Sequence, residues 1–374
     1  MCIRALKLYN FRNLVDQNLS FSEGTNFIVG KNAQGKTNLI EAIHLLSATR
    51  SFRTSIWREM IRWGETSASV FGEIESAQLE AAAYQLGLTL SPEGREGYLN
   101  GQRTALLTGF YGKLSTITFS PTDIALVTGG PQVRRRFVDR HLADFDPRFI
   151  REMLTYTHAL KNKNELLKDG IEDDMLLDPW DKVMAESAYQ IEKGRLLFLE
   201  RLAHKAGAIL KNFGESDGKL SIQLSTGLKP HDLASPDAVY GAIKAVRRKE
   251  QIYKTSLIGP HRDEILFTLG GKAARAFASQ GQARSLTLAL KLAVIELLEE
   301  EKEKSPVLLL DDVDAELDDE RAQTLFAFAL QPVRQVFITG ISLREDLLKQ
   351  AHNLQIMKVE DGVIKAHPDP SFGV

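Results

Sequence analysis

The sequence predicts an α/β protein whose phosphate-binding core is assembled from both ends of the chain around an inserted, compact helical lobe. Three observations support this fold class. A glycine-rich loop lies between a strand pattern and a helix pattern near the N-terminus, and an apolar strand ending in two carboxylates lies near the C-terminus. Between them the apolar residues follow a helical period. The core should contain a mixed β-sheet and a separate β-rich subdomain.

The glycine-rich loop has the pattern G-x-x-x-x-G-K-T and comprises Gly30, Lys31, Asn32, Ala33, Gln34, Gly35, Lys36 and Thr37. Residues 26–29 before it suit a buried strand, and residues 38–46 after it have apolar side chains at helical spacing. Glycines let backbone N–H groups turn towards phosphate oxygens, while Lys36 can reach the β- and γ-phosphates and Thr37 can hold Mg²⁺. The alternative is a chance match in a turn, which the flanking patterns disfavour. The chain is therefore predicted to bind a nucleoside triphosphate.

Length and composition indicate a globular protein of two or three domains. The chain has 374 residues, of which 43% are apolar and 26% charged. No run of about 18 apolar residues occurs, so we expect no membrane span. The N-terminus begins with a strand-like pattern and has no signal-peptide core. Cys2 is the only cysteine, which excludes an intrachain disulfide and fits a reducing cytoplasm.

The charge distribution is compatible with nucleic-acid binding without establishing it. The net charge is −2, but residues 1–62 contain nine Lys or Arg against four Asp or Glu. Two basic triplets follow at 134–136 and 247–249. Local basic patches can contact phosphates. Arginine triplets on helices are also common on solvated faces, so charge alone leaves both interpretations open.

The patterns predict three segments, 1–118, 119–250 and 251–374. The first should contain strands at 3–8, 25–29, 68–74 and 82–90, a helix at 37–47 and a hairpin around Asn100-Gly101. The second should be helical, with Asp178-Pro179 opening a helix of about 34 residues, roughly 50 Å long, that ends before Gly214. The third should contain a hairpin around Gly270-Gly271 with its second arm near 274–278. It should also contain a helix at 283–301 and a buried strand at 307–310.

The acidic strand end at 306–312 provides the second half of the site. After the apolar run, Asp311 can hold Mg²⁺ opposite Thr37, and Asp312 can orient or deprotonate an attacking water. One alternative is a capped acidic turn. A calcium loop is another, built on Asp312, Asp314 and Glu316. It fails because Leu317 and Gln323 occupy positions that need Gly and Glu.

The spacing of the motifs shows how the core must be assembled. Lys36 and Asp311 are 275 positions apart (311 − 36), so the two ends of the chain must meet. Just before the acidic strand, residues 279–282 open a helix with Ser279 and Gly281. A helix start of this kind can bind an anion such as a γ-phosphate, or it can be a simple N-cap turn.

In this order the motifs resemble the ABC-type head ATPases of the SMC group, and among them the RecF family of bacterial recombination and repair proteins. The resemblance covers nearly the whole chain. Besides the 30–37 loop it rests on F-R-N at 11–13, R-S-F-R-T at 50–54, F-S-P-T-D-I at 119–124, L-V-T-G-G-P at 126–131, R-R-R-F-V-D at 134–139, G-P-H-R-D-E at 259–264, S-Q-G-Q at 279–282 and L-D-D-V-D-A-E-L-D at 310–318.

The resemblance implies a P-loop ABC-type ATPase head that forms a homodimer around ATP and Mg²⁺. Arg12 and Asn13 would reach the nucleotide, Thr37 and Asp311 would hold the metal, and Asp312 would be catalytic. The signature residues Ser279, Gly281 and Gln282 of one subunit would face the loop of the other, with Asp318 in the D-loop at the interface. The dimer would be a weak, DNA-stimulated ATPase that binds double- and single-stranded DNA.

The same resemblance implies cytoplasmic partners and a pathway. RecR and RecO would cooperate with the protein in loading RecA at gaps and stalled forks, in replication, repair and the SOS response. Two positions depart from related ATPases. Asp312 stands where transport ATPases usually have Glu, which fits slow hydrolysis. Thr339 and Gly340 stand where a switch histidine is often found.

Two other functions share part of these motifs. A membrane-transport ATPase subunit has them, but its loop and acidic strand are usually much closer together. A small-molecule kinase would need an acceptor site and no signature motif. His261, in the G-P-H-R-D-E segment, fits a structural turn, a role in packing the two halves of the core, or a position near DNA at least as well as catalysis.

Overall fold

A computed structural model describes residues 1–75, 83–104, 109–213, 219–302, 305–313, 317–342 and 345–366. The chain forms two compact units. Unit 1 comprises Met1–Asp123 and Ile295–Val374, and unit 2 comprises Ile124–Val294. The boundary predicted at residue 250 falls inside unit 2, because strands on either side of that position pair with each other there.

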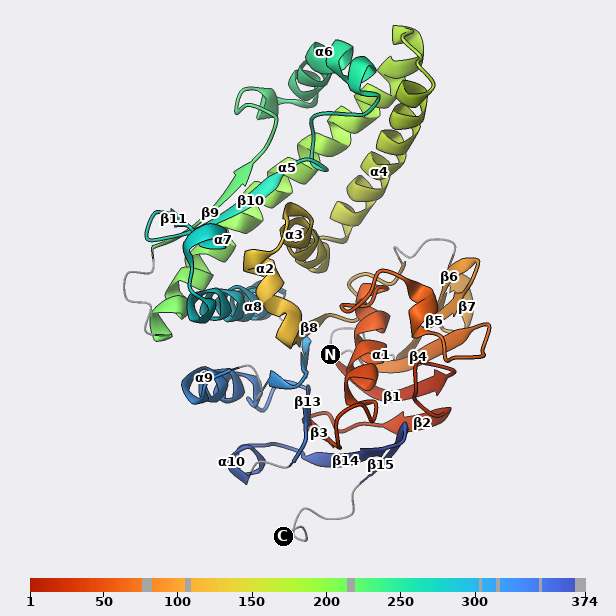
Figure 1. The fold of residues 1–374 in the computed structure, drawn as a ribbon, viewed down its shortest axis with the longest axis vertical. Helices are drawn as coiled ribbons and strands as arrows, with labels where there is room; N and C mark the ends of the chain where they lie inside the picture. The colour runs from red at the N-terminus through yellow and green to blue at the C-terminus, as the bar shows by residue number, and fades with distance from the viewer. Residues whose placement is uncertain are drawn as a thin grey trace. The chain divides into compact units, whose positions relative to one another are not determined.

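The first sheet of unit 1 is antiparallel, with six strands in the order β2-β1-β4-β5-β6-β7 (Figure 1). Asn100 and Gly101, both with positive φ, make the β6–β7 turn, as the sequence predicted. The strands are β1 Cys2–Tyr9, β2 Gln17–Ser20, β4 Ala68–Glu75, β5 Tyr84–Ser91, β6 Gly94–Leu99 and β7 Gln102–Thr104. Residue 82 of the predicted strand 82–90, and residues 105–106, expected in the second arm of this hairpin, lie outside the described residues.

The second sheet of unit 1 has six strands in the order β15-β14-β3-β13-β12-β8. Five of them run parallel and only β15 is antiparallel to its neighbour. The central strands are short apolar runs buried on both faces, as parallel sheets require. The strands are β3 Thr25–Val29, β8 Thr116–Phe119, β12 Val307–Leu310, β13 Val336–Gly340, β14 Gln355–Glu360 and β15 Val363–Ala366.

Helix α1, Lys36–Ala48, packs against strands of both sheets and so lies between them. Its residues Leu39, Ile43 and Leu46 are fully buried in one apolar cluster that also includes side chains of both sheets. The predicted strand, loop and helix order around residue 36 is therefore present. The remaining short helices are η1 Trp57–Met60, η3 Pro121–Ile124, α9 Asp319–Ala329 and α10 Glu345–Leu348.

Unit 2 contains the predicted helices. They are α2 Ala125–Thr128, α3 Pro131–Phe145, α4 Pro147–Lys168, α5 Asp174–Asn212, η4 Asp232–Ala234 and α6 Pro236–Tyr253. The long helix begins earlier than predicted: Asp173 is its N-cap and Pro179 lies inside it. A proline so near the start removes a single helical hydrogen bond, and the helix continues through it. Gly214, the predicted stop, lies outside the described residues.

A small sheet and two further helices complete unit 2. The sheet order is β11-β10-β9, with β9 Leu220–Ser225, β10 Glu264–Leu269 and β11 Lys272–Ala273. The predicted hairpin at Gly270-Gly271 is present, but the predicted position of its second arm, near 274–278, was wrong. Only residues 272–273 pair, and Ala274–Phe277 form α7, in which buried Ala274 packs inward. Helix α8, Gln280–Lys302, then continues from unit 2 into unit 1.

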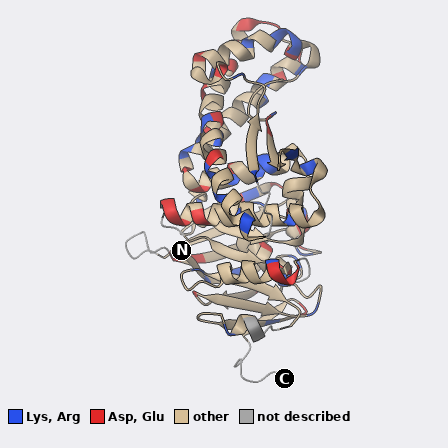
Figure 2. Cartoon of the chain, turned by 90° about the vertical axis from the view of Figure 1, so that its left-hand side faces the viewer, with Lys and Arg blue, Asp and Glu red and all other residues tan. Residues whose placement is uncertain are grey.

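Buried ion pairs hold helices α4, α5 and α6 of unit 2 together. Lys163 of α4 is fully buried and contacts Asp181 and Glu250, each at 2.6 Å, while Arg247 of α6 also pairs with Asp181 at 2.6 Å. Figure 2 shows charges of both signs intermixed along these helices. One residue of the basic triplet at 247–249, Arg247, is therefore engaged in an internal ion pair. In the described part of the chain, no helix is both long and apolar enough to span a bilayer.

Candidate functional site

The loop at 30–37 encloses the ammonium group of its own lysine. Lys36 is almost fully buried, and its Nζ donates to the carbonyl oxygens of Gly30 at 2.8 Å and Lys31 at 3.1 Å. Ala33 and Gly35 have φ of 63° and 121°, and this left-handed backbone turns successive N–H groups towards the centre of the loop. A concave set of amide donors with an ammonium group inside it fits a polyphosphate.

The order of the parallel strands brings the two halves of the site together. Strand β13 lies between β3, which leads into the loop, and β12, which leads into Asp311. At the carboxyl ends of these strands the Thr37 hydroxyl donates to Asp311 Oδ1 at 2.9 Å. Thr339, at the end of β13, donates to the same oxygen at 3.0 Å. The predicted pairing of Thr37 and Asp311 is thus present across 274 positions of sequence.

The environment of Asp311 fits a hard cation. Burial raises the pKa of its carboxyl to about 6, against the lowering effect of the Thr37 hydrogen bond. A buried carboxylate beside a hydroxyl offers the oxygen ligands that Mg²⁺ prefers, and a bound cation would offset the cost of its burial. Asp314 and Glu316, on which the calcium alternative depended, lie outside the described residues.

Comparison with known proteins identifies the family. The family model for the RecF/RecN/SMC N terminal domain matches residues 2–365. A Bacillus cytotoxicus protein named DNA replication and repair protein RecF is 36% identical over 365 residues, covering 95% of this chain and 97% of that protein. A Pediococcus pentosaceus protein of the same name is 35% identical over 375 residues, covering 97% and 98%. The chain belongs to the RecF family.

Solved structures agree with this assignment. One described as the recombination mediator protein RecF-ATP in the RecFOR pathway is 33% identical, with a TM-score of 0.88, covering 98% of this chain and 97% of that one. The Smc head of Pyrococcus furiosus has 19% identity and a TM-score of 0.53, and therefore shares the fold. The predicted class, an ABC-type ATPase head with a helical insert, is confirmed. The comparisons do not favour the transport-ATPase alternative.

In this RecF-family chain Arg12 is tied to a residue that the sequence analysis missed. Its Nε and Nη2 donate to Glu41 at 2.9 and 2.8 Å, and Nη1 donates to the Glu59 carbonyl at 2.5 Å. Glu41 lies one helical turn after Thr37, its side chain is fully buried, and it also contacts Arg53 at 3.5 Å. Glu41 could have been recognised from the sequence as a single acidic residue on the apolar face of the predicted helix.

The rest of the loop and its neighbours are also connected. Asn13 donates to the Ala33 carbonyl at 3.2 Å and accepts from Asn38 at 2.7 Å. The carbonyl of Gln34 accepts from Gly362 N at 3.1 Å. Lys31 and Asn32 are exposed. Asn13 and Gln34 are thus hydrogen-bonded to residues that surround the loop. Direct contact of Arg12 and Asn13 with the nucleotide stays a prediction.

Asp312 lies beside the Mg²⁺ aspartate in a left-handed conformation with φ of 45°. Its N–H donates to the Thr339 hydroxyl at 2.9 Å, so the backbone is fixed while the carboxyl stays partly exposed. Thr339 thus bridges both acids from the position where the switch histidine was expected. Its bridging role was the second feature that sequence reasoning missed.

The predicted signature segment forms the exposed N-terminus of α8. Ser279 N donates to the Gln282 side chain at 3.0 Å, and Gln282 N donates to the Ser279 hydroxyl at 3.1 Å. This reciprocal pair of hydrogen bonds is a capping box, which confirms the predicted N-cap turn. Whether the same helix start also binds an anion stays a prediction. Asp318 caps α9 by accepting from Arg321 N at 3.0 Å and is also exposed.

His261 lies in a buried polar network of unit 2. Its Nδ1 lies 2.6 Å from the Tyr156 hydroxyl and its Nε2 3.4 Å from the Ser256 carbonyl, a pattern that suits a neutral ring accepting from Tyr156. Burial lowers the pKa of His261 to about 4. Nearby Arg195 bridges Asp139 and Asp263 at 2.9 and 2.5 Å. These contacts fit the structural turn considered for His261. Tyr156 and Ser256 both lie in unit 2, so they do not bear on packing between the two halves of the core.

Proposed function

We propose that this RecF-family chain binds ATP and Mg²⁺ in the 30–37 loop. The observation that carries the proposal is the Thr37–Asp311 hydrogen bond, which joins the loop to the acidic strand end. Lys36, inside the loop, would transfer its donors from two carbonyls to the β- and γ-phosphates. When bound, Mg²⁺ would neutralise phosphate charge, held by Thr37 and Asp311.

The same site supports slow ATP hydrolysis. Asp312 follows the metal aspartate directly, and its fixed backbone and partly exposed carboxyl suit a residue that accepts a proton from water. Aspartate has a shorter reach than glutamate, which favours a slow, switch-like enzyme. Asp312→Asn should retain ATP binding and accumulate the ATP-bound form.

We further propose that ATP closes a homodimer. Ser279, Gly281 and Gln282 would face the loop of a second copy, and Asp318 would lie at the same interface. The exposure of Ser279 supports this, since a helix N-terminus at the surface can receive the γ-phosphate of a partner's nucleotide. The ATP-bound state would then be a dimer and the ADP-bound state a monomer.

The dimer would hold double- or single-stranded DNA largely through backbone phosphates and release it after hydrolysis. RecR and RecO would be its partners, with RecA loading at gaps and stalled forks as the outcome, in the cytoplasm. The RecF names of the relatives and the RecFOR pathway of the solved structure support these assignments. DNA binding should therefore depend on both ATP and salt.

Sedimentation velocity with ATP, ADP or no nucleotide tests the proposal. The wild type should dimerise only with ATP. Lys36→Ala should stay monomeric because it binds ATP weakly. Ser279→Arg should stay monomeric while still binding ATP, and the exposed control Thr66→Arg should dimerise normally. An ATP-dependent dimer of Ser279→Arg would exclude the composite site, and equal dimerisation with ADP would exclude the switch.

A further inference from the structure

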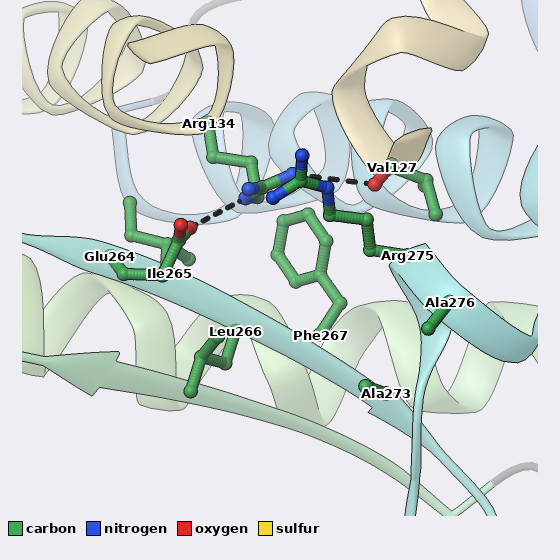
Figure 3. Close-up of a pocket in the computed structure, with 9 residues that line it drawn as sticks. All are labelled: Val127, Arg134, Glu264, Ile265, Leu266, Phe267, Ala273, Arg275 and Ala276. Carbon is green, nitrogen blue, oxygen red and sulfur yellow. Dashed lines mark hydrogen bonds and ion pairs between the residues drawn. The ribbon is translucent and has the colours of Figure 1, made fainter. Parts of the chain in front are cut away.

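Unit 2 has a pocket beside α7, the helix that precedes the signature segment, and no residue of the proposed ATP site lines it. Its volume is about 390 Å³, within the range of ligand pockets. Strand β10 lines one side, with the Phe267 ring turned towards the arginines and Leu266 on the opposite side of the strand, while α2, α3 and α7 supply Val127, Arg134 and Arg275 (Figure 3). Most of the wall is apolar, and the polar side chains gather at one end, above the ring of Phe267.

The charges in this pocket are unequal. Arg134 is 3% exposed and is fixed by Glu264 at 2.9 Å and by the carbonyl of Gly129 at 2.8 Å. Arg275 lines the same pocket, is exposed, and has no hydrogen-bond or ion-pair partner within the described part of the chain. Two guanidinium groups thus face one carboxylate, leaving an excess positive charge beside apolar walls.

We infer that this pocket binds a short peptide segment of a partner protein that carries a carboxylate next to large apolar side chains. The planar donors of Arg275 match a carboxylate, and the largely apolar lining, with the Phe267 ring beneath the two guanidinium groups, suits a neighbouring apolar side chain. A nucleic-acid backbone fits less well. Its sugars are polar and its bases need hydrogen-bond partners, whereas the walls are apolar.

Occupancy of the pocket would act on the signature segment. Helix α7 forms one wall, and its last hydrogen bond, from Ala278 N to the Ala274 carbonyl at 3.0 Å, directly precedes Ser279. A ligand held by Arg275 would fix α7 and with it the start of α8. This regulatory step rests on the proposed dimerisation through Ser279, whereas peptide binding itself does not.

Calorimetry on the full chain without nucleotide tests the binding. The probe is acetyl-Asp-Leu-Phe with a free terminal carboxylate, compared with the neutral acetyl-Asn-Leu-Phe amide. The acidic peptide should bind about tenfold more tightly than the neutral one, and Arg275→Gln should remove most of that difference. Ala276→Phe, which fills the pocket from α7, should weaken both peptides. Arg151→Gln, an exposed cation of α4, is the matched control and should bind like the wild type.

Three outcomes would overturn the inference: no heat with either peptide at millimolar concentration, equal affinity for both, or equal affinity of wild type and Arg275→Gln. Inorganic phosphate that binds as well as the peptide would make the pocket a phosphate site instead.

Because this assay contains no ATP, its failure is separate from a failure of the ATP-dependent dimer. If both hold, saturating acidic peptide should shift the dimerisation constant at least severalfold in the wild type and leave Arg275→Gln unchanged.

Discussion

The Arg12–Glu41 pair offers the sharpest test of the candidate site, because the sequence assigned Arg12 to the nucleotide and the structure engages it elsewhere. All three guanidinium nitrogens of Arg12 donate to protein oxygens, two of them to Glu41. We therefore expect Arg12 to stabilise unit 1 through Glu41. The perturbation is a double-mutant cycle with Arg12→Gln, Glu41→Gln and the double variant.

The magnitude follows from burial and from the partners that remain. Breaking a buried ion pair by removing one partner costs about 3–5 kcal/mol. Glu41 keeps contacts with Ser51 and Arg53 when Arg12 is lost, and Arg12 is 17% exposed, so we reduce each single cost to about 2–3 kcal/mol. The double variant leaves no unpaired buried charge and should cost about 3–4 kcal/mol, which gives a coupling of about 1.5 kcal/mol.

Urea unfolding followed by tryptophan fluorescence measures the cycle. Trp57 and Trp63 lie in unit 1 and Trp180 in unit 2, so a Trp180→Phe background reports unit 1 alone. A coupling energy below about 0.5 kcal/mol would refute the reasoning. ATP titration of the same variants adds a second criterion. If Arg12→Gln weakens ATP binding far more than Glu41→Gln does, Arg12 contacts the nucleotide directly, as the family resemblance implies.

Three further predictions concern single residues. Thr339→Val removes the donor to Asp311 and the acceptor of Asp312 N, and should cost about 2–3 kcal/mol in urea unfolding, while Thr339→Ser stays close to wild type. Gly35→Ala places a Cβ 2.7 Å from Leu14 at φ of 121°, and should cost about 2 kcal/mol and weaken ATP binding in a fluorescent-nucleotide assay, unlike Gly241→Ala in an open helical position. Burial lowers the pKa of His261 to about 4 in the folded state. The neutral ring therefore contributes its full stability above about pH 6.5, the ordinary pKa of histidine, and this contribution is lost as the pH falls to the folded-state pKa. From about pH 7.5 to pH 5 the wild type should lose about 2 kcal/mol more than His261→Gln, and parallel pH profiles would contradict this.

The sequence predicted the elements of the site better than their connections. The strand at 307–310 and the helix at 37–47 could be read from local apolar patterns, and the loop from its glycines. Glu41 and Thr339 could not be placed in the site, because their importance depends on which strands are neighbours. Strand β13 pairs with β3 across 311 positions of sequence (336 − 25), as Val336 with Thr25 shows, and no local pattern encodes such a pairing.

The errors in the helical unit have the same origin. Asp178-Pro179 has the form of a helix start, yet Arg247 of α6 holds Asp178 and Asp181, so packing against α6 extends α5 through the proline. Residues 274–278 follow a turn and suit a strand locally, but buried Ala274 and the packing of α7 on β10 favour a helix. Tertiary contacts override a weak local preference in both cases.

Helix α8 joins the two predicted halves of the ATP-dependent interface within one chain. It begins at the capping box of Ser279 and spans 23 residues, about 35 Å as a continuous helix. Its end is held in unit 1 by Glu299, which pairs with buried Arg334 at 2.7 and 2.8 Å. Arg334 lies two residues before β13, whose penultimate residue is Thr339. These contacts connect the helix that Ser279 caps with the strand that carries Thr339.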